Sequence, residues 1–359
     1  MVLNRKYGFW ILVVLSVLYY SCSGIDTRDN IELYWNNELV LPSSSGMSPN
    51  KGLAGAYCGF VGNRLIIAGG ANFPEQYPWD GGHKVWWSTL YSYDKITGQW
   101  EVYEDFLEKP LAYGLSFQIK EGVLCIGGNN ADSCYKDVFL ITERGGKLEI
   151  DKDYYPSLPV PLSNLSGGQI GEKIYLAGGQ ESMSPEQSSH HFFVMDMSRP
   201  SDGWKALPSW PGPTLAYSVC VPQKEKLYLF GGRSFGEGKG LVVHTEGYCY
   251  DPETQNWSVL DGDFPVMAGN GISYKEDNIL FYGGVESIIP GSVSHPGFSQ
   301  KVLKYDLRKN TIEEICESPY PIGVTTSMVS DGDVQYIVSG EIKPGIRTPH
   351  ILRAIIKDE

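Results

Sequence analysis

An apolar run that ends in a pair of glycines recurs six times along this chain, and it constrains the possible fold more than any other feature. The first copy, residues 65–70, reads LIIAGG, and the sixth has Ser339 in place of its first glycine. The first residues of the six pairs are 58, 51, 53, 52 and 56 residues apart: Gly69, Gly127, Gly178, Gly231, Gly283 and Ser339. This spacing indicates one unit copied six times, although 359 residues would allow two average domains.

Each repeat contains a pattern of short strands around its glycine pair. In the first repeat we expect strands at 54–61, 64–70, 88–94 and 99–104, and a tryptophan opens the fourth strand in three repeats: Trp100, Trp204 and Trp257. A period near ~50 residues with a glycine pair is typical of kelch-type β-propeller blades. The sequence therefore predicts an all-β fold, a six-bladed kelch-type β-propeller over residues 31–359.

The two ends of the propeller region are expected to complete one blade. The sixth repeat stops at its third strand, 351–357, and lacks a fourth strand with a tryptophan. The stretch Leu33–Leu39, which contains Trp35, has the missing pattern. An unpaired sheet edge invites association with other chains. We therefore predict that this N-terminal strand closes the last blade like a clasp.

Charge and cysteine content exclude several kinds of partner. The net charge is −13 and no basic cluster follows the first residues, which argues against nucleic acid as a partner. An anionic ligand would need a few well-placed cations. Of the six cysteines beyond Cys22, four fall inside predicted strands and none has metal-binding spacing, so we expect buried free thiols, no metal and no cofactor.

The N-terminus has the features of an export signal. Residues 1–22 contain Arg5 and Lys6, followed by an apolar stretch that is too short for a comfortable membrane span. The small residue before Cys22 resembles a bacterial lipoprotein cleavage site, with Cys22 as the lipidated residue; cleavage after Ser23 is the alternative. Residues 23–30 are predicted to form a tether. Both cleavages predict an exported, periplasmic protein, and only cleavage before Cys22 predicts contact with a membrane, through the lipid anchor.

The loops after the glycine pairs are predicted to carry the binding site. In a four-stranded blade these loops share one face with the loops that lead into the innermost strands, and function usually lies on such loops. The polar residues that follow the pairs are Asn72, Asn129-Asn130, Gln180-Glu181, Arg233, Glu286 and Glu341. From these we take Asn72, Asn129, Glu181, Arg233 and Glu286 as candidates for substrate binding. The long insert 72–87 is either a lid over the site or simple packing.

One segment resembles the signature of a known family. Residues 340–348 read GEIKPGIRT and are similar to the Gly-Glu-x-Lys-Pro-Gly-x-Arg-Thr signature of bacterial N-acetylneuraminate epimerases, the sialic acid mutarotases. Residues 55–70, 88–89 and 112–114 resemble further segments of that family. In the family's enteric members these segments stand in the reverse order. The chain therefore resembles a cyclically permuted branch, and the resemblance spans most of residues 31–359.

The resemblance implies a reaction and two residues that perform it. Glu341 matches the proposed catalytic acid/base and Arg347 its paired active-site arginine. One carboxylate that gives and takes protons could open and reclose the sugar ring, interconverting the α and β anomers of N-acetylneuraminate. A guanidinium could hold the carboxylate of this sugar acid, and no cofactor is required.

Three other interpretations stay open at this point. Glu341 and Arg347 could form a solvated surface ion pair of little energetic weight. The propeller could bind carbohydrate or protein without catalysis. A copper radical oxidase on the same fold would need a Cys–Tyr cross-link and two histidine ligands, and no evident ligand set is present among the six histidines.

Overall fold

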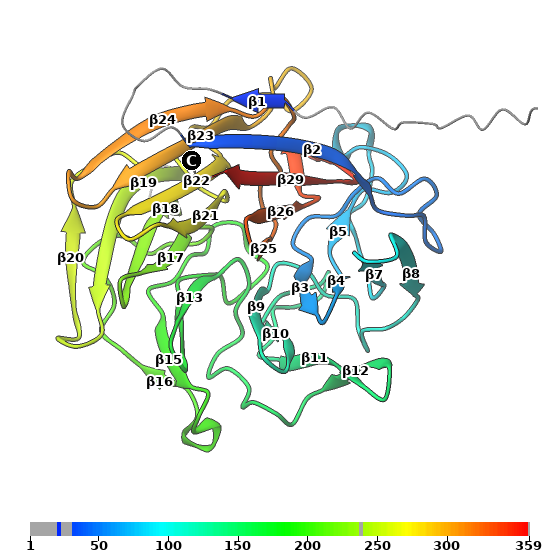
Figure 1. Ribbon diagram of the computed structural model, residues 1–359, viewed down its shortest axis with the longest axis horizontal. Helices are drawn as coiled ribbons and strands as arrows, with labels where there is room; N and C mark the ends of the chain where they lie inside the picture. Colours follow the sequence, from blue (N-terminus) through cyan, green and yellow to red (C-terminus); the bar gives the residue numbers. More distant parts are fainter. Residues whose placement is uncertain (1–19, 23–30, 237–239, 358–359) are drawn as a thin grey trace, which may run out of the picture.

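The computed structural model describes residues 20–22, 31–236 and 240–357. Its main sheets are six antiparallel sheets, five with four strands and one with five, arranged as blades around a common axis (Figure 1). This confirms the predicted all-β, six-bladed β-propeller. No helix in the described parts of the chain is long and apolar enough to cross a membrane. Residues 1–19 of the predicted signal segment 1–22, and the whole predicted tether 23–30, lie outside the described residues.

The first three blades follow the chain order from the innermost strand outward. Their strands are β3 (Tyr57–Val61), β4 (Arg64–Ala68), β7 (Leu90–Asp94) and β8 (Gln99–Tyr103); β9 (Leu115–Ile119), β10 (Gly122–Ile126), β11 (Val138–Arg144) and β12 (Lys147–Asp151); and β13 (Ser166–Ile170), β14 (Lys173–Ala177), β15 (Phe192–Asp196) and β16 (Lys205–Ala206). The strand predicted at 54–61 begins only at Tyr57, because Gly55 turns the chain with a φ of 68°.

The last three blades repeat this order, except that blade 6 takes strands from both ends of the chain. Their strands are β17 (Val219–Gln223), β18 (Lys226–Gly236), β19 (Gly240–Asp251) and β20 (Asn256–Leu260); β21 (Asn270–Tyr274), β22 (Asn278–Gly284), β23 (Ser299–Asp306) and β24 (Thr311–Glu317); and β25 (Met328–Asp331), β26 (Val334–Val338), β29 (His350–Lys357), β2 (Glu32–Val40) and β1 (Tyr20–Cys22). The remaining elements are two short two-stranded ribbons and two 3-10 turns. The ribbons pair β5 (Ala71–Asn72) with β6 (Val85–Trp86) and β27 (Glu341–Lys343) with β28 (Ile346–Arg347), and the turns are η1 (Pro78–Asp80) and η2 (Pro200–Asp202).

A closed ring of backbone hydrogen bonds joins the six blades at the axis. Each loop that leads into an innermost strand contains one residue of this ring. Its N–H donates to the carbonyl of the corresponding residue in the neighbouring blade, over 2.7–2.9 Å. The six residues are Gly55, Tyr113, Asn164, Tyr217, Ala268 and Thr325. All six have left-handed φ angles of 51–68°. Each blade is thereby fixed to both of its neighbours, and the loops around the axis form a rigid frame.

The glycine pairs are required by close packing between blades. A Cβ on Gly127 would lie 2.3 Å from the carbonyl oxygen of Leu162 in the loop of the next blade, and its φ is 63°. Only glycine adopts this conformation readily in so little space. Ser339, the exception, has a φ of 60°, and its hydroxyl accepts from the N–H of Leu53 (2.8 Å) while donating to the carbonyl of Thr348 (2.5 Å). These bonds offset the cost of its backbone conformation.

The N-terminal strand closes blade 6 as predicted. β2 lies between β29 and β1, and β2 and β29 run side by side although they come from opposite ends of the chain (Figure 1). The observed strand, Glu32–Val40, extends the predicted one by a residue at each end. Trp35 is fully buried and meets the ring of Tyr282 of blade 5 edge-on, with centroids 6.2 Å apart. The clasp therefore also contributes to the contact between blades 5 and 6.

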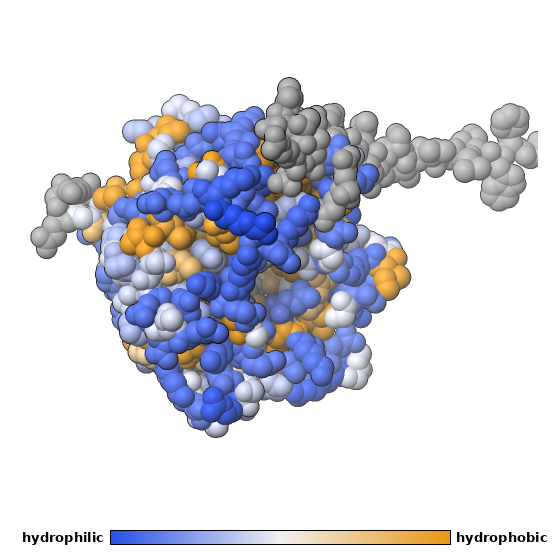
Figure 2. All heavy atoms as spheres, turned by 60° about the vertical axis from the view of Figure 1, so that its left-hand side comes forward, coloured by the Kyte–Doolittle hydropathy of each residue, from blue (hydrophilic) through white to orange (hydrophobic). Residues whose placement is uncertain are grey.

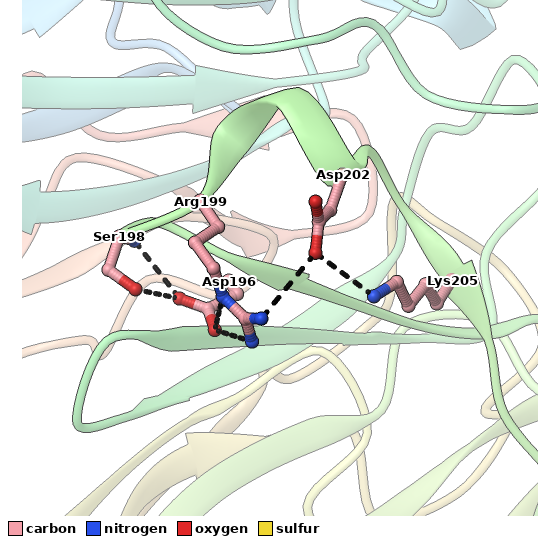
Figure 3. Close-up of polar contacts among 5 residues, drawn as sticks. All are labelled: Asp196, Ser198, Arg199, Asp202 and Lys205. Atoms are coloured by element: carbon pink, nitrogen blue, oxygen red, sulfur yellow. Dashed lines mark hydrogen bonds and ion pairs between the residues drawn. The ribbon is translucent and has the colours of Figure 1, made fainter.

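Polar contacts stabilise the outer turn of blade 3, where the fourth strand is only two residues long. Arg199 pairs with Asp196 at 2.9 Å and Lys205 with Asp202 at 3.3 Å on either side of η2 (Figure 3). Hydrogen bonds from Ser198 and Arg199 lower the pKa of Asp196 to about 2. These groups are solvent-facing, and exposed pairs contribute little to stability. We assign this cluster to the turn and to no binding function.

The surface and the cysteines agree with an acidic protein that does not rely on disulfides. The face in Figure 2 is mostly hydrophilic, with hydrophobic residues in small separate groups. Within the described residues the six cysteines beyond Cys22 are free, and five of them are buried. The blade cores thus depend on apolar packing between neighbouring sheets, for example the cluster that contains Leu33, Trp35 and Tyr282.

Candidate active site

The signature segment forms a tight hairpin that brings Glu341 and Arg347 together. β27 and β28 pair antiparallel, and Glu341 stands directly opposite Arg347. The turn between them passes through Pro344 and Gly345, which has a φ of 81°. The N–H of Gly345 donates to Oε1 of Glu341 at 2.7 Å, and Nη1 of Arg347 lies 3.2 Å from the same oxygen. The backbone of the turn therefore holds the carboxylate of Glu341 in place.

Arg347 is a buried cation with unused hydrogen-bond donors. Its side chain is 4% exposed, whereas that of Glu341 is 20% exposed. The guanidinium lies 4.9 Å from the ring centre of Phe73. Its Nε makes no hydrogen bond to any described residue, and its Nη1 is close to Glu341 without hydrogen-bond geometry. A buried donor without a partner is costly. Arg347 is therefore not a solvated surface residue, and it has the capacity to bind an acceptor from a ligand.

A cleft of about 510 Å³ opens at this hairpin. Among the described residues that line it there are three cations, Arg347, Arg233 and Lys84, and one carboxylate, Glu341. The whole chain carries a net charge of −13. The local excess of positive charge within an acidic protein favours an anionic ligand here.

The residue that directly follows each glycine pair occupies an equivalent place in every blade. Each forms a backbone bridge with the incoming loop of its own blade: Ala71, Asn129, Gln180, Arg233, Val285 and Glu341. All of these except Ala71 line the cleft. Of the residues predicted for substrate binding, the structure thus places Arg233 and Asn129 beside Glu341 in one cleft.

The structure does not bring Asn72, Glu181 or Glu286 into the cleft. Each stands one residue after the bridged position, and successive side chains of an extended chain point to opposite faces. Asn72 is buried and donates to the carbonyl of Gly52 at 2.6 Å. Glu181 pairs with His191 at 2.9 Å, and Glu286 accepts from Ser299 at 2.8 Å. The expectation that these three bind the substrate of this cleft is therefore corrected.

The insert 72–87 forms one wall of the cleft. Phe73, Pro78, Lys84 and Trp86 of this segment line it, and Pro78 lies directly against the hairpin turn. A Cβ on Gly345 would be 2.8 Å from Cγ of Pro78. Nε1 of Trp86 donates to Oδ1 of Asn129 at 3.0 Å, which ties the insert to blade 2. The segment is thus packed on the site as a wall.

Sequence reasoning missed two tyrosines of the axial ring. Tyr113 and Tyr217 line the cleft and have φ angles of 61°. Burial raises the pKa of Tyr217 to about 12, so its phenol is a neutral donor at pH 7. The signal was present, because a Leu-Ala-Tyr triplet occurs both at 111–113 and at 215–217. No group of three or more His, Cys, Asp or Glu side chains among the described residues is placed to hold a metal ion.

Comparison with known proteins identifies the family. A family model described as N-acetylneuraminate epimerase matches residues 24–150 and 155–295, well over half of the chain. This chain belongs to that family of β-propeller proteins. The matched segments end before the hairpin of Glu341 and Arg347.

Individual relatives are similar to this chain at low identity. The N-acetylneuraminate epimerase of Vibrio vulnificus is 26% identical over 55% of this chain and 58% of its own length. That of Brucella melitensis is 24% identical over 57% of this chain and 60% of its own. A kelch domain-containing protein of Vibrio cholerae is 25% identical over 59% and 66%. The matches thus cover about three fifths of the relatives' length.

Proposed function

We propose that this protein is a mutarotase that interconverts the α and β anomers of N-acetylneuraminate. The observation that carries the proposal is the position of Glu341, a carboxylate held by a backbone N–H and a guanidinium in a cleft that also contains Arg233 and Lys84. Family membership and the names of the relatives support this substrate. The cleft volume of about 510 Å³ is ample for one sugar acid.

The proposed reaction needs one proton to leave the anomeric hydroxyl and one to reach the ring oxygen. Glu341 takes the hydroxyl proton, the oxygen's electron pair forms the carbonyl, and the bond from the anomeric carbon to the ring oxygen breaks. The ring oxygen takes the proton back from Glu341 and becomes a hydroxyl, which returns Glu341 to its carboxylate form. Rotation about the adjacent carbon–carbon bond presents the other face of the carbonyl, and the same steps in reverse close the ring. No atom or electron is gained overall, so a positioned acid/base is sufficient.

The direct test is proton NMR of freshly released α-N-acetylneuraminate with and without the protein. We expect relaxation toward the β anomer to accelerate in proportion to protein concentration. A rate equal to the uncatalysed rate, together with measurable sugar binding, would contradict mutarotation. That result would support instead a propeller that binds carbohydrate without catalysis.

We also propose that the protein is exported and anchored through a lipid on Cys22. The support is in the sequence of residues 1–22, where a basic start and an apolar stretch precede Ser21 and Cys22. Radiolabelled palmitate is expected to enter the wild-type protein and not a Cys22→Ala variant. Cys134→Ala, which removes a buried thiol of the propeller, is the control and should retain the label. Unlabelled wild-type protein would indicate cleavage after Ser23 and a periplasmic product without an anchor.

A further inference from the structure

Arg233 is a cation of the cleft that no described carboxylate neutralises. It follows the glycine pair of blade 4, at the place that Glu341 occupies in blade 6. Its guanidinium carbon lies 4.4 Å from the ring centre of Tyr217, and its buried Nε has no hydrogen-bond partner. No ion pair of the described residues includes it. A cation–π contact positions a guanidinium but leaves its N–H groups available.

Arg347 differs from Arg233 in the charge that it faces. Its Nη1 lies 3.2 Å from the carboxylate of Glu341, so its charge is already partly compensated. A ligand carboxylate placed on Arg347 would also approach Glu341, and two carboxylates repel each other. The charge arrangement therefore favours Arg347 as the residue that orients Glu341, and Arg233 as the residue that receives an anion.

The two arginines lie on different sides of the cleft. The guanidinium of Arg347 lies over Phe73, which follows the glycine pair of blade 1, whereas Arg233 and Tyr217 belong to blade 4. In a ring of six blades, blades 1 and 4 are opposite each other. Tyr217 is close enough to both Arg233 and Glu341 for their charges to act on its phenol. A small ligand that contacts Glu341 therefore also lies near Arg233.

Two tyrosines that line the cleft, one of them in contact with Arg233, occupy backbone positions that disfavour them. Tyr113 and Tyr217 stand at left-handed positions of the axial ring, where blade 1 has Gly55. A bulky residue with positive φ is uncommon and costs free energy, and such strain gathers at functional sites. The hydroxyl of Tyr113 is buried and has no hydrogen-bond partner. The phenol of Tyr113 is therefore a donor that the described residues do not use, and the phenol of Tyr217 lines the same cleft.

We propose that Arg233, with the hydroxyls of Tyr217 and Tyr113, is the seat for the substrate's carboxylate and determines specificity for sugar acids, while Arg347 positions Glu341. This inference rests on the proposed function and divides the roles of the two arginines, since the sequence resemblance pointed to Arg347 for the carboxylate. In N-acetylneuraminate the carboxylate is attached to the anomeric carbon. A carboxylate held at Arg233 keeps that carbon at Glu341 while the rest of the opened sugar rotates.

The test compares the binding of N-acetylneuraminate with that of its methyl ester, which keeps the anomeric hydroxyl but lacks the charge. Calorimetry on the full chain gives the dissociation constants of the acid and the ester. Their ratio is the acid-over-ester preference, and it can be measured without turnover. Hydrogen bonds to a charged group stabilise by about 1.5–3 kcal/mol, so we expect the wild-type protein to prefer the acid by about 10- to 100-fold. Arg233→Gln should reduce this preference to roughly threefold or less, and Arg233→Lys should retain part of it.

Two further variants separate the roles. Arg347→Lys should keep the acid-over-ester preference and lower the maximal rate of anomer exchange, whereas Arg233→Gln should mainly raise KM for the acid. Arg144→Gln, which removes an arginine that pairs with Glu149 and Asp151 outside the cleft, is the matched control and should change neither quantity. Unchanged melting temperatures establish that each variant is folded.

Specific outcomes would overturn the inference. If Arg233→Gln kept the full acid-over-ester preference, the carboxylate would bind elsewhere, and if Arg347→Lys alone lost it, the two roles would be reversed. Failure of the proposed function has a different signature. In that case the wild-type protein would bind the acid in preference to the ester, and lose this preference with Arg233→Gln, without accelerating anomer exchange. A wild-type protein that bound neither ligand would overturn both proposals.

Discussion

Glu341→Gln is expected to slow anomer exchange by about 10²- to 10⁴-fold, the range that a positioned acid/base contributes. Glutamine has the size of glutamate, and its amide oxygen can still accept the hydrogen bond from the N–H of Gly345. The amide cannot take the proton of the anomeric hydroxyl. The measurement is the NMR relaxation of the α anomer at saturating sugar, with sugar affinity determined on the same samples by calorimetry.

The control for this prediction is Glu186→Gln, which makes the same change at an exposed position in the loop after the glycine pair of blade 3. That variant should exchange anomers at the wild-type rate. Binding is expected to persist in Glu341→Gln, because the proposed carboxylate seat at Arg233 is intact. If Glu341→Gln exchanged anomers as fast as the wild-type protein, the proton carrier would have to be another group, and the role of the hairpin would be wrong.

The sequence was sufficient to predict the frame of this fold. Glycine pairs at near-constant spacing mark the places where one blade approaches the next, and glycine satisfies so close a contact at positive φ in every pair except the sixth, where Ser339 takes the first position. The missing fourth strand of the sixth repeat was an equally direct signal, since Leu33–Leu39 had the pattern that the C-terminus lacked. Both predictions depended on local patterns repeated along the chain.

The candidate site was predicted less completely, because its assembly depends on register. The backbone bridge between Gln180 and Ser163 determines that Gln180, and not Glu181, faces the cleft. A shift of this pairing by one residue would turn the Glu181 side chain toward the cleft instead. The same reason removed Asn72 and Glu286 from the site. Composition alone favours charged residues as ligands, and it therefore selected two glutamates that pair with other side chains outside the cleft.

Contacts between segments that are far apart in the sequence could not be predicted either. The contact of Pro78 with Gly345 joins the insert of blade 1 to the hairpin of blade 6, and nothing in either segment indicates the other. Lys84 belongs to the same insert and lines the cleft. Arg347 has a carboxylate within 4 Å and Arg233 has none among the described residues, and the one-dimensional pattern does not contain that distance.

Trp35→Ala is expected to destabilise the propeller by about 3–5 kcal/mol, the usual cost of removing a large buried aromatic side chain. Trp35 is fully buried between β29 and blade 5, where it contacts Tyr282, and its Nε1 has no hydrogen-bond partner. Its contribution therefore comes from packing, so Trp35→Phe should lose less than Trp35→Ala. Val40→Ala, on the same strand at a side chain that is 38% exposed, is the control and should cost much less. Free energies of unfolding from chemical denaturation give the comparison. If Trp35→Ala were no more destabilising than Val40→Ala, the N-terminal strand would pair with β29 without holding the ring closed.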